Sequence, residues 1–440
     1  MQDNDNDRDM TNVGETDRPR LLKARVSALS GTGGVSTPAS RCTLTFPDGT
    51  EQERISIACL RRLGLEHLLF EYCVEAPGKD RKAKATLNTL TAASLVPHTQ
   101  HSLAAELARD PSGHVTLRTS NSNEPTTPYP PRAFTYIEDL AVSPLLTAPG
   151  TMDPRCVDFL EACACDPDSD CSLTDTTCTC PGRVALFDDE TDGNEDPALE
   201  AAYDPSSGRL RPTYATGSRG IAECSACCGC DPTRCPNRVV QRSPTNVRLV
   251  VYDAGPEKGG WAAAAAEPIA RGTYVAQYIG DVVPASVAAA RTRAYAALGY
   301  QQYAFDMDFF FCSGSSTDQA ASEYVVDAQF RAGVARFFNH SCEPNLITIG
   351  VMYDSATPLF HRLAFFAARD IAAGDELTFD YGGNMAGIDS EFVEPTTTAR
   401  PKPKGGKRKK SSSSSKNNNN KRSLAFDCQC GSVVCRGRIL

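Results

Sequence analysis

The residues of this chain best suited to chemistry are its cysteines, 19 among 440 residues. A first cluster reads Cys-x-Cys-x5-Cys-x6-Cys-x-Cys and continues, after an acidic segment, as Cys-x3-Cys-x-Cys-x4-Cys. Its nine members are Cys163, Cys165, Cys171, Cys178, Cys180, Cys224, Cys228, Cys230 and Cys235. Cys-x-Cys pairs suit thiolates that bridge neighbouring metal ions, and these thiolates complete three tetrahedral zinc sites if three of them bridge. The spacing therefore predicts a structural three-zinc cluster.

A shorter cluster near the end of the chain offers three further thiolates, Cys428, Cys430 and Cys435. A structural zinc ion takes four ligands, so one ligand must come from elsewhere in the chain. Cys342, within Asn-His-Ser-Cys-Glu-Pro-Asn at 339–345, is the best candidate. We therefore expect a second zinc site that joins this segment to the middle of the chain.

Other uses of the cysteines fit the sequence less well. The first residues lack the apolar stretch of a signal peptide, and the first cluster has an odd number of cysteines, so a disulfide scaffold is disfavoured. No histidine or carboxylate stands at ligand spacing within that cluster, which argues against a catalytic zinc. A zinc-binding nucleic-acid module is disfavoured because residues 166–204 contain twelve acidic residues and one arginine.

The overall composition supports a folded protein of two or three domains, because 41% of the residues are hydrophobic. The formal net charge of -9 argues against a general nucleic-acid coat, whose affinity would come from neutralising phosphates. No run of about 18 apolar residues occurs, so we expect no membrane span and no membrane partner. A reducing compartment is the expected environment.

The elements that must position these cysteines are mainly β. Short β-branched runs at 247–252, 273–279, 323–326, 346–351 and 363–366 are separated by turn residues. Residues 285–297, rich in Ala and Arg, predict one helix. Amphipathic residues at 57–72 lie in an N-terminal region without motifs, and residues 130–137 predict a strand that enters the folded unit.

Five further motifs follow the first cysteine cluster in a fixed order. They are Gly260-Trp261, Tyr278-x-Gly280, Tyr303-x-Phe305-Asp306-x-Asp308, Arg-Phe-Phe-Asn-His-Ser-Cys at 336–342, and Glu-Leu-Thr-Phe-Asp-Tyr-Gly at 376–382. With both cysteine clusters, this order resembles the SET-domain protein lysine methyltransferases, and within them the fungal type of the suppressor-of-variegation class, which acts on lysine nine of histone H3. The resemblance implies a SET-domain β-fold with a knot-like C-terminal segment, flanked by a pre-SET three-zinc cluster and a post-SET zinc site.

The resemblance also implies roles for individual residues. S-adenosylmethionine would be bound by residues of three motifs, namely Gly259, Gly260, Trp261, Tyr303, Arg336, Asn339 and His340. Tyr381 and Tyr278 would be the active-site tyrosines, with Tyr381 aligning the lysine amine, and Asp308 would meet the basic histone tail. Such a reaction depends mainly on holding a neutral amine in line with the sulfonium methyl group.

Phe379 carries a prediction about the product. In this family a tyrosine at that place can hydrogen-bond the amine or a retained water, whereas phenylalanine leaves room for further methyl groups. We therefore expect a di- or trimethylating enzyme. The alternative is that Phe379 is an ordinary core residue without influence on the product.

The expected domain organisation follows from these motifs and from composition. The divisions are a disordered acidic tail at 1–40, an N-terminal region of unknown role at 41–128, an N-terminal flank of the pre-SET unit at 129–155, a pre-SET zinc-cluster domain at 156–243, a SET catalytic domain at 244–384, a disordered basic insert at 385–425 and a post-SET zinc motif at 426–440. The insert holds nine Lys/Arg between 402 and 422, which is typical of a nuclear import signal, a DNA contact or a solvated loop.

Taken together, these features predict a histone-lysine N-methyltransferase of the nucleus and chromatin that acts on the histone H3 tail in nucleosomes and serves heterochromatin formation. A catalytically silent chromatin adaptor with a SET fold is the alternative, and intact Tyr381, Asn339 and His340 argue against it. Because residues 41–128 show no chromodomain signature, we expect targeting to depend on a separate recruiting subunit.

Overall fold

The computed structural model describes a little under three fifths of the chain. The described residues are 24–31, 39–46, 50–62, 66–75, 81–87, 100–118, 134–143, 146, 163, 165, 171, 201–214, 219–255, 260–298, 300–311, 322–355, 357–382 and 426–439. Three expectations lie outside them: the ligands Cys178 and Cys180, the cofactor residue Gly259, and the basic insert at 385–425. Among the described residues, no helix is long and apolar enough to cross a membrane.

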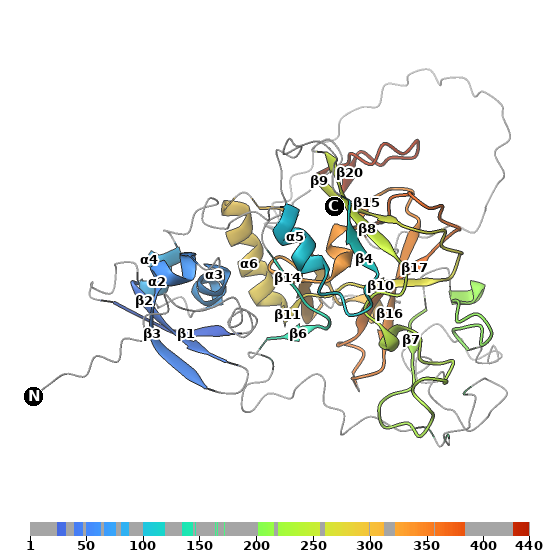
Figure 1. Ribbon diagram of the computed structural model, residues 1–440, viewed down its shortest axis with the longest axis horizontal. Helices are drawn as coiled ribbons and strands as arrows, with labels where there is room; N and C mark the ends of the chain where they lie inside the picture. Colours follow the sequence, from blue (N-terminus) through green and yellow to red (C-terminus); the bar gives the residue numbers. More distant parts are fainter. Residues whose placement is uncertain are drawn as a thin grey trace, which may run out of the picture.

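The described residues between 24 and 87 form an N-terminal module, drawn in blue in Figure 1. Its antiparallel sheet has the order β1-β2-β3, and three helices follow. The bounds are β1 Arg25–Ser30, β2 Arg41–Thr45, β3 Glu51–Ser56, α2 Ile57–Arg62, α3 Glu66–Glu75 and α4 Arg81–Leu87. The expectation of a disordered tail at 1–40 is wrong for β1, because the pairing with β2 buries Ala24 and Val26 against this module's core.

Residues 100–143 supply one edge strand to each of three sheets. The strand β4 pairs in parallel with β8, which continues antiparallel into β9, while β5 pairs with β14 and β6 with β11. The bounds are α5 Gln100–Leu107, β4 Val115–Leu117, β5 Thr135–Tyr136, β6 Ala141–Val142, β8 Leu249–Gly255, β9 Gly260–Ala265, β11 Asp281–Pro284 and β14 Arg331–Ala332. The strand expected at 130–137 is therefore present as the short β5.

Two four-stranded sheets make the centre of the fold, with the orders β10-β17-β16-β7 and β12-β13-β11-β6. Their remaining strands are β7 Ile221–Ala222, β10 Tyr274–Gln277, β12 Ala304–Asp306, β13 Tyr324–Asp327, β16 Leu346–Met352 and β17 Arg362–Ala367. Every residue of β16 and β17 is buried, which accounts for their nearly continuous apolar sequences. The five strands and the helix α6, Ala285–Ala297, occur where the sequence predicts them.

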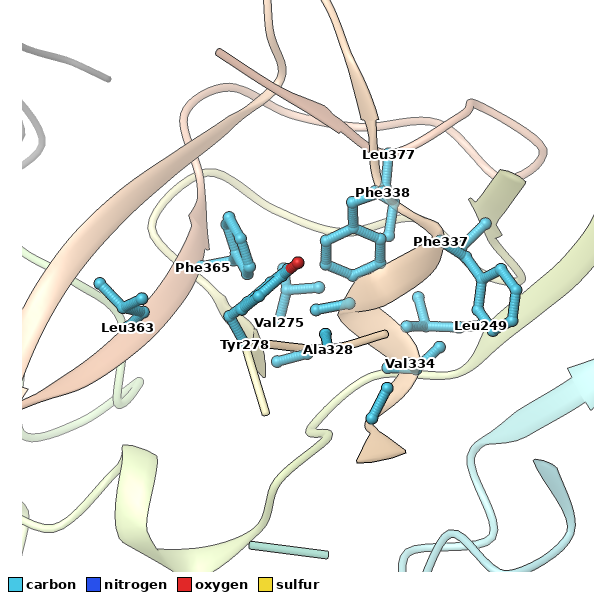
Figure 2. Close-up of a cluster of buried hydrophobic side chains, with 14 of the residues drawn as sticks. Leu249, Val275, Tyr278, Ala328, Val334, Phe337, Phe338, Leu363, Phe365 and Leu377 are labelled. Carbon is cyan, nitrogen blue, oxygen red and sulfur yellow. The ribbon is translucent and has the colours of Figure 1, made fainter. Parts of the chain in front are cut away.

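The largest apolar cluster lies between these sheets. Figure 2 shows the rings of Tyr278, Phe338 and Phe365 gathered around Val275, with Leu377 packed on Phe338. Single-turn helices occur at η5 Pro212–Tyr214, η6 Val240–Arg242, η8 Phe309–Phe311 and η9 Val334–Phe337. Of these, η9 packs in the largest cluster, whereas the other three contribute to a second apolar cluster. Because Tyr278 is itself part of the largest cluster, the core and the candidate site share one wall.

Two segments that are far apart in the sequence meet in a short parallel pair. The strand β15, Asn339–His340, pairs with β18, Thr378–Phe379, with His340 opposite Phe379. This pairing places the fourth and fifth motifs side by side, as the family resemblance implies. A C-terminal hairpin of β19, Phe426–Asp427, and β20, Arg438–Ile439, lies beside β15 in Figure 1.

Candidate active site and zinc centres

Aromatic rings from four elements form one continuous wall. Phe379 of β18 stacks on Phe305 of β12 at 5.6 Å between centroids and lies 4.7 Å from the ring of Tyr381. Tyr278 follows β10 and lies 5.2 Å from Phe305, while Phe365 of β17 backs Phe379 at 4.8 Å. Such a wall suits the aliphatic stem of a lysine side chain, which is apolar up to its amine.

Two tyrosine hydroxyls are fixed at this wall by backbone carbonyls. Tyr278 donates to the carbonyl oxygen of Tyr303, and Tyr381 donates to that of Phe338, each at 2.8 Å. Each phenol oxygen thereby keeps its lone pairs to accept a hydrogen bond. Burial raises the pKa of the Tyr278 phenol above the ordinary value, and desolvation of the Tyr381 hydroxyl, in a side chain that is 46% exposed, raises the pKa of that phenol too, so both stay neutral at physiological pH. They can therefore orient an amine, but not act as phenolate bases.

Arg336 forms a second part of the site and is 5% exposed. Its guanidinium lies 3.8 Å from the ring centre of Tyr303, and Nη1 donates to the carbonyl oxygen of Gln329 at 2.7 Å. Among the described residues, Nε and Nη2 of Arg336 and both polar atoms of the Gln329 side chain have no hydrogen-bond partner. Buried polar groups are normally paired, so this group fits the polar and anionic parts of a bound molecule.

The first motif, Gly260-Trp261, meets Asn339 of the fourth motif through a hydrogen bond. Gly260 has a φ of +93°, which favours glycine, and a Cβ added there would meet nothing within 4 Å. The amide of Asn339 donates to the carbonyl oxygen of Trp261 at 3.3 Å and to Glu376 at 2.8 Å. Glu376, which sequence reasoning did not single out, thus fixes the orientation of Asn339.

His340 connects the aromatic wall to a cysteine. Its Nδ1 accepts the backbone N–H of Tyr381 at 3.1 Å, so the ring proton belongs on Nε2, which lies 3.3 Å from Sγ of Cys342. Sequence reasoning placed His340 in the cofactor site and did not foresee this bridge. Its role toward the cofactor stays a prediction.

Four sulfurs meet at the C-terminal hairpin. Those of Cys342, Cys428, Cys430 and Cys435 all lie within 4.8 Å of one another, and Cys342 and Cys428 are 3.7 Å apart. Zinc–sulfur bonds of about 2.3 Å in a tetrahedron separate the sulfurs by about 3.8 Å, whereas a disulfide bond measures about 2.05 Å. The geometry fits a closed structural zinc site whose fourth ligand comes from the segment after β15.

The first cysteine cluster is buried and has a shared ligand. One group of sulfurs joins Cys224 with Cys171, Cys230 and Cys235, and a second joins Cys224 with Cys163 and Cys228. A thiolate common to two groups is what a bridged zinc cluster requires. The described cysteines are free of disulfides.

Side chains next to this cluster orient its sulfurs. Arg238 directs Nε and Nη2 at Sγ of Cys230, both at 3.4 Å, and Asn237 directs its amide at Cys224 at 3.5 Å. Such outer donors stabilise negative charge on metal-bound thiolates. Cys165 joins the cluster through a 3.5 Å contact between its sulfur and that of Cys171.

Asp306 and Asp308 lie at the end of β12, which is the outer strand of its sheet. Burial raises the pKa of both carboxyls, and Asp306 adds to the effect on Asp308. The charged forms of these two acids, of which Asp306 is exposed and Asp308 half-buried, are stabilised when a cation approaches. The open strand edge with acids at its end is therefore suited to an extended basic peptide.

Comparison with known proteins agrees with this geometry. The family model of the SET domain matches residues 260–382, and the family model of the Pre-SET motif matches residues 112–238. The H3 lysine-9 specific histone-lysine N-methyltransferase dim-5 of Neurospora crassa is 32% identical over 285 residues, which cover 63% of this chain and 77% of that protein. The chain therefore belongs to the SET-domain family of H3 lysine-9 histone-lysine N-methyltransferases.

Two further matches show how much of the chain and of its relatives is similar. The H3 lysine-9 specific histone-lysine N-methyltransferase of Schizosaccharomyces pombe is 32% identical over 312 residues, covering 70% of this chain and 52% of the relative, so the chain spans about half of that protein. The solved Neurospora SET domain protein DIM-5 has 27% identity and a TM-score of 0.47, covering 64% of this chain and 98% of that one. The Pre-SET match begins at residue 112, inside the segment 41–128, for which the sequence predicted no role.

Proposed function

We propose that the protein transfers methyl groups from S-adenosylmethionine to lysine nine of the histone H3 tail. The observation that carries this proposal is the placement of two neutral tyrosine hydroxyls, those of Tyr278 and Tyr381, in one aromatic wall. Arg336, two of whose nitrogens have no partner in the described part of the chain, stacks on Tyr303, whose carbonyl oxygen accepts from Tyr278. An amine and a charged cofactor would thus meet at adjoining surfaces.

The cofactor would be held by residues around Arg336. When bound, S-adenosylmethionine supplies a methyl group made electrophilic by the neighbouring sulfonium. The unpaired N–H groups of Arg336 suit the carboxylate of its amino-acid part, and the amide of Gln329 suits its other polar atoms. Gly260 leaves open space in front of its backbone, beside Trp261.

The lysine would be prepared by the aromatic wall. A free lysine has a pKa of about 10.4, and an apolar channel disfavours its charged form, so the amine loses its proton more readily there. The phenol oxygens of Tyr278 and Tyr381 would accept hydrogen bonds from the amine and hold its lone pair in line. Phe379 adds no hydroxyl to this wall, which supports formation of the di- or trimethyl state.

The histone tail would bind along β12 as an additional strand, with Asp306 and Asp308 facing its basic residues. Both relatives described above are named as H3 lysine-9 specific, which supports this substrate and a place of action in the nucleus, on nucleosomes and in heterochromatin. The basic insert, with nine Lys/Arg between 402 and 422, would serve as an import signal or a DNA contact.

The test is transfer of a radiolabelled methyl group to H3 tail peptides by the wild type and by Tyr381→Phe. We expect labelling of the wild-type peptide, none of a peptide with alanine at position nine, and a loss of at least about a hundredfold in Tyr381→Phe. Tyr274→Phe is the matched control, because it also removes a hydroxyl that donates to a carbonyl, that of Ser243, away from the site.

Two outcomes would contradict the proposal. If Tyr381→Phe still labels the peptide at the wild-type level, the Tyr381 hydroxyl is not required for methyl transfer. Binding of the H3 peptide without any transfer by the wild type would instead favour a catalytically silent chromatin adaptor.

A further inference from the structure

The N-terminal module packs against the catalytic half of the molecule. Figure 1 shows α3 beside α6, the helix that leads from β11 toward β12. Phe70 of α3 stacks on Tyr295 of α6 at 5.1 Å and meets the edge of Phe330 at 5.7 Å. Tyr295 and Phe330 are buried in the apolar core of the module itself. The module therefore shares a core with residues of the SET domain.

A buried ion network crosses the same contact. Glu71 of α3 accepts from Arg331 at 3.0 Å, and Arg331 also donates to Asp281 at 2.5 and 2.7 Å. Glu75 of α3 pairs with Arg291 of α6. The side chains of Glu71, Asp281, Arg291 and Arg331 are between 1% and 7% exposed, so water weakens these contacts little.

The network extends to the end of β13. Nη1 of Arg291 donates to Asp281 at 3.2 Å and to Asp327 at 2.9 Å, and the hydroxyl of Tyr295 donates to Asp327 at 2.7 Å. Asp327 is the last residue of β13, where it lies opposite Asp281 of β11. Glu71 and Glu75 thus act on the point at which the chain leaves β13.

The segment that leaves β13 holds Gln329 and Arg336, whose side chains carry the polar atoms without a partner among the described residues. The carbonyl oxygens of Ala328 and Gln329 accept from Nη1 of Arg336, and the N–H of Ala328 donates to Tyr303 at 2.9 Å. Arg331 lies two residues after Gln329, in β14. The ion network and the Arg336 site therefore share one short segment, 327–336, which contributes residues to both.

We propose that Glu71, with Glu75, positions segment 327–336 for S-adenosylmethionine, so that the N-terminal module is part of the machinery that sets cofactor affinity. Glu71 is a positioning residue that acts through Arg331. This inference rests on the proposed function for the identity of the cofactor. It gives a role to an N-terminal region in which the sequence shows no motif.

Charge balance makes the inference testable in the full chain. Four carboxylates, Glu71, Glu75, Asp281 and Asp327, surround Arg291 and Arg331, and Arg25 of β1 interacts with Arg331 as a third cation. Glu71→Gln keeps the shape of the side chain and leaves Arg331 with both bonds to Asp281. The variant therefore removes the charge with which Glu71 holds Arg331, without leaving a buried charge unpaired.

The experiment measures binding of S-adenosylmethionine to the full chain by calorimetry, without peptide, and then steady-state kinetics. We expect Glu71→Gln to raise the dissociation constant and the KM for the cofactor by about fivefold, the lower end of typical coupling between sites. The kcat at saturating cofactor and the KM for the H3 peptide should stay within about twofold of wild type. The matched control is Glu51→Gln in β3 of the same module, which removes the charge of an exposed carboxylate that accepts from Thr45.

A double variant separates positioning from general loosening. Because Glu71 acts through Arg331, Glu71→Gln combined with Arg331→Lys should raise the dissociation constant no more than Arg331→Lys alone. Additive effects, or unchanged cofactor binding in Glu71→Gln, would overturn the inference. A fall in kcat equal to the rise in KM would also overturn it, since that pattern indicates a damaged catalytic site. Cofactor binding by the wild type tests the proposed function separately.

Discussion

The two candidate zinc centres use the same ligand chemistry in different surroundings. The first cluster is buried, and its described ligands all lie between 163 and 235. The C-terminal site is partly exposed and takes Cys342 from the segment that also holds His340. In Figure 1 the green first-cluster region and the red C-terminal hairpin lie at opposite ends of the central sheets. The first is therefore suited to stabilise the fold and the second to complete the active site.

The largest expected effect comes from removing one ligand at each centre. Cys342→Ser should lose about one zinc per chain and at least about a hundredfold in methyl transfer, because the bridge through His340 to Tyr381 loses its anchor. Cys171→Ser should instead lower the unfolding temperature by several degrees, because its ligand group includes the shared Cys224. Zinc content, activity and thermal unfolding are the measurements. Equal losses of stability in the two variants would erase the distinction.

Removal of zinc from the wild type by a chelator should distinguish the two zinc centres by the order in which they lose their metal. The partly exposed C-terminal sulfurs should lose their zinc first, so methyl transfer should disappear before the unfolding signal changes. Zinc release is followed with a colorimetric indicator, alongside activity and circular dichroism. Activity that persists in fully zinc-stripped protein would break the link between the C-terminal site and catalysis.

A smaller effect is expected from the ion pair that joins the hairpin to the site. Arg436 Nη2 lies 2.5 Å from Asp380, the neighbour of Tyr381, and its backbone N–H donates to Cys342 at 3.3 Å. Arg436→Ala should lower kcat/KM for the peptide about fivefold, because the arginine is partly exposed and screening limits the pair to about 1 kcal/mol.

The hairpin offers a matched control for this prediction. Arg438 and Asp427 form a pair at 3.8 Å whose side chains are largely exposed, away from Tyr381. Arg438→Ala should leave kcat/KM unchanged. If both arginine variants lose the same activity, the effect belongs to the hairpin as a whole and not to the contact with Asp380.

The sequence predicted most of the fold because the strands of the two central sheets are short apolar runs between turns, and the helix at 285–297 is set by local propensity. The meeting of Cys342 with the C-terminal cysteines could also be predicted, since three thiolates need a fourth. The strand β1 could not, because its short mixed sequence is held by pairing with β2 and by burial of Ala24 and Val26 in the module core.

Contacts between distant residues were likewise beyond sequence reasoning. Glu71 and Arg331 are 260 residues apart, and neither stands in a motif. The His340 bridge depends on which ring nitrogen meets Tyr381, which only the fold determines. Phe305 stands two residues after Tyr303 in the third motif, and this spacing was the signal that could have placed it in the aromatic wall.

The smallest expected effect on the rate of methyl transfer, and the clearest effect on its product, comes from Phe379 in the aromatic wall. Phe379 is 5% exposed, and its ring lies among those of Phe305, Phe365 and Tyr381. A hydroxyl added by Phe379→Tyr would occupy space at the amine and hydrogen-bond it, so monomethyl lysine should accumulate while the first transfer stays within about threefold of wild type. Mass spectrometry of H3 peptides over time measures both quantities. If the C-terminal zinc site determines the rate and the aromatic wall determines the product, Phe379→Tyr changes only the product. Trimethylation at the wild-type level would show that Phe379 is an ordinary core residue.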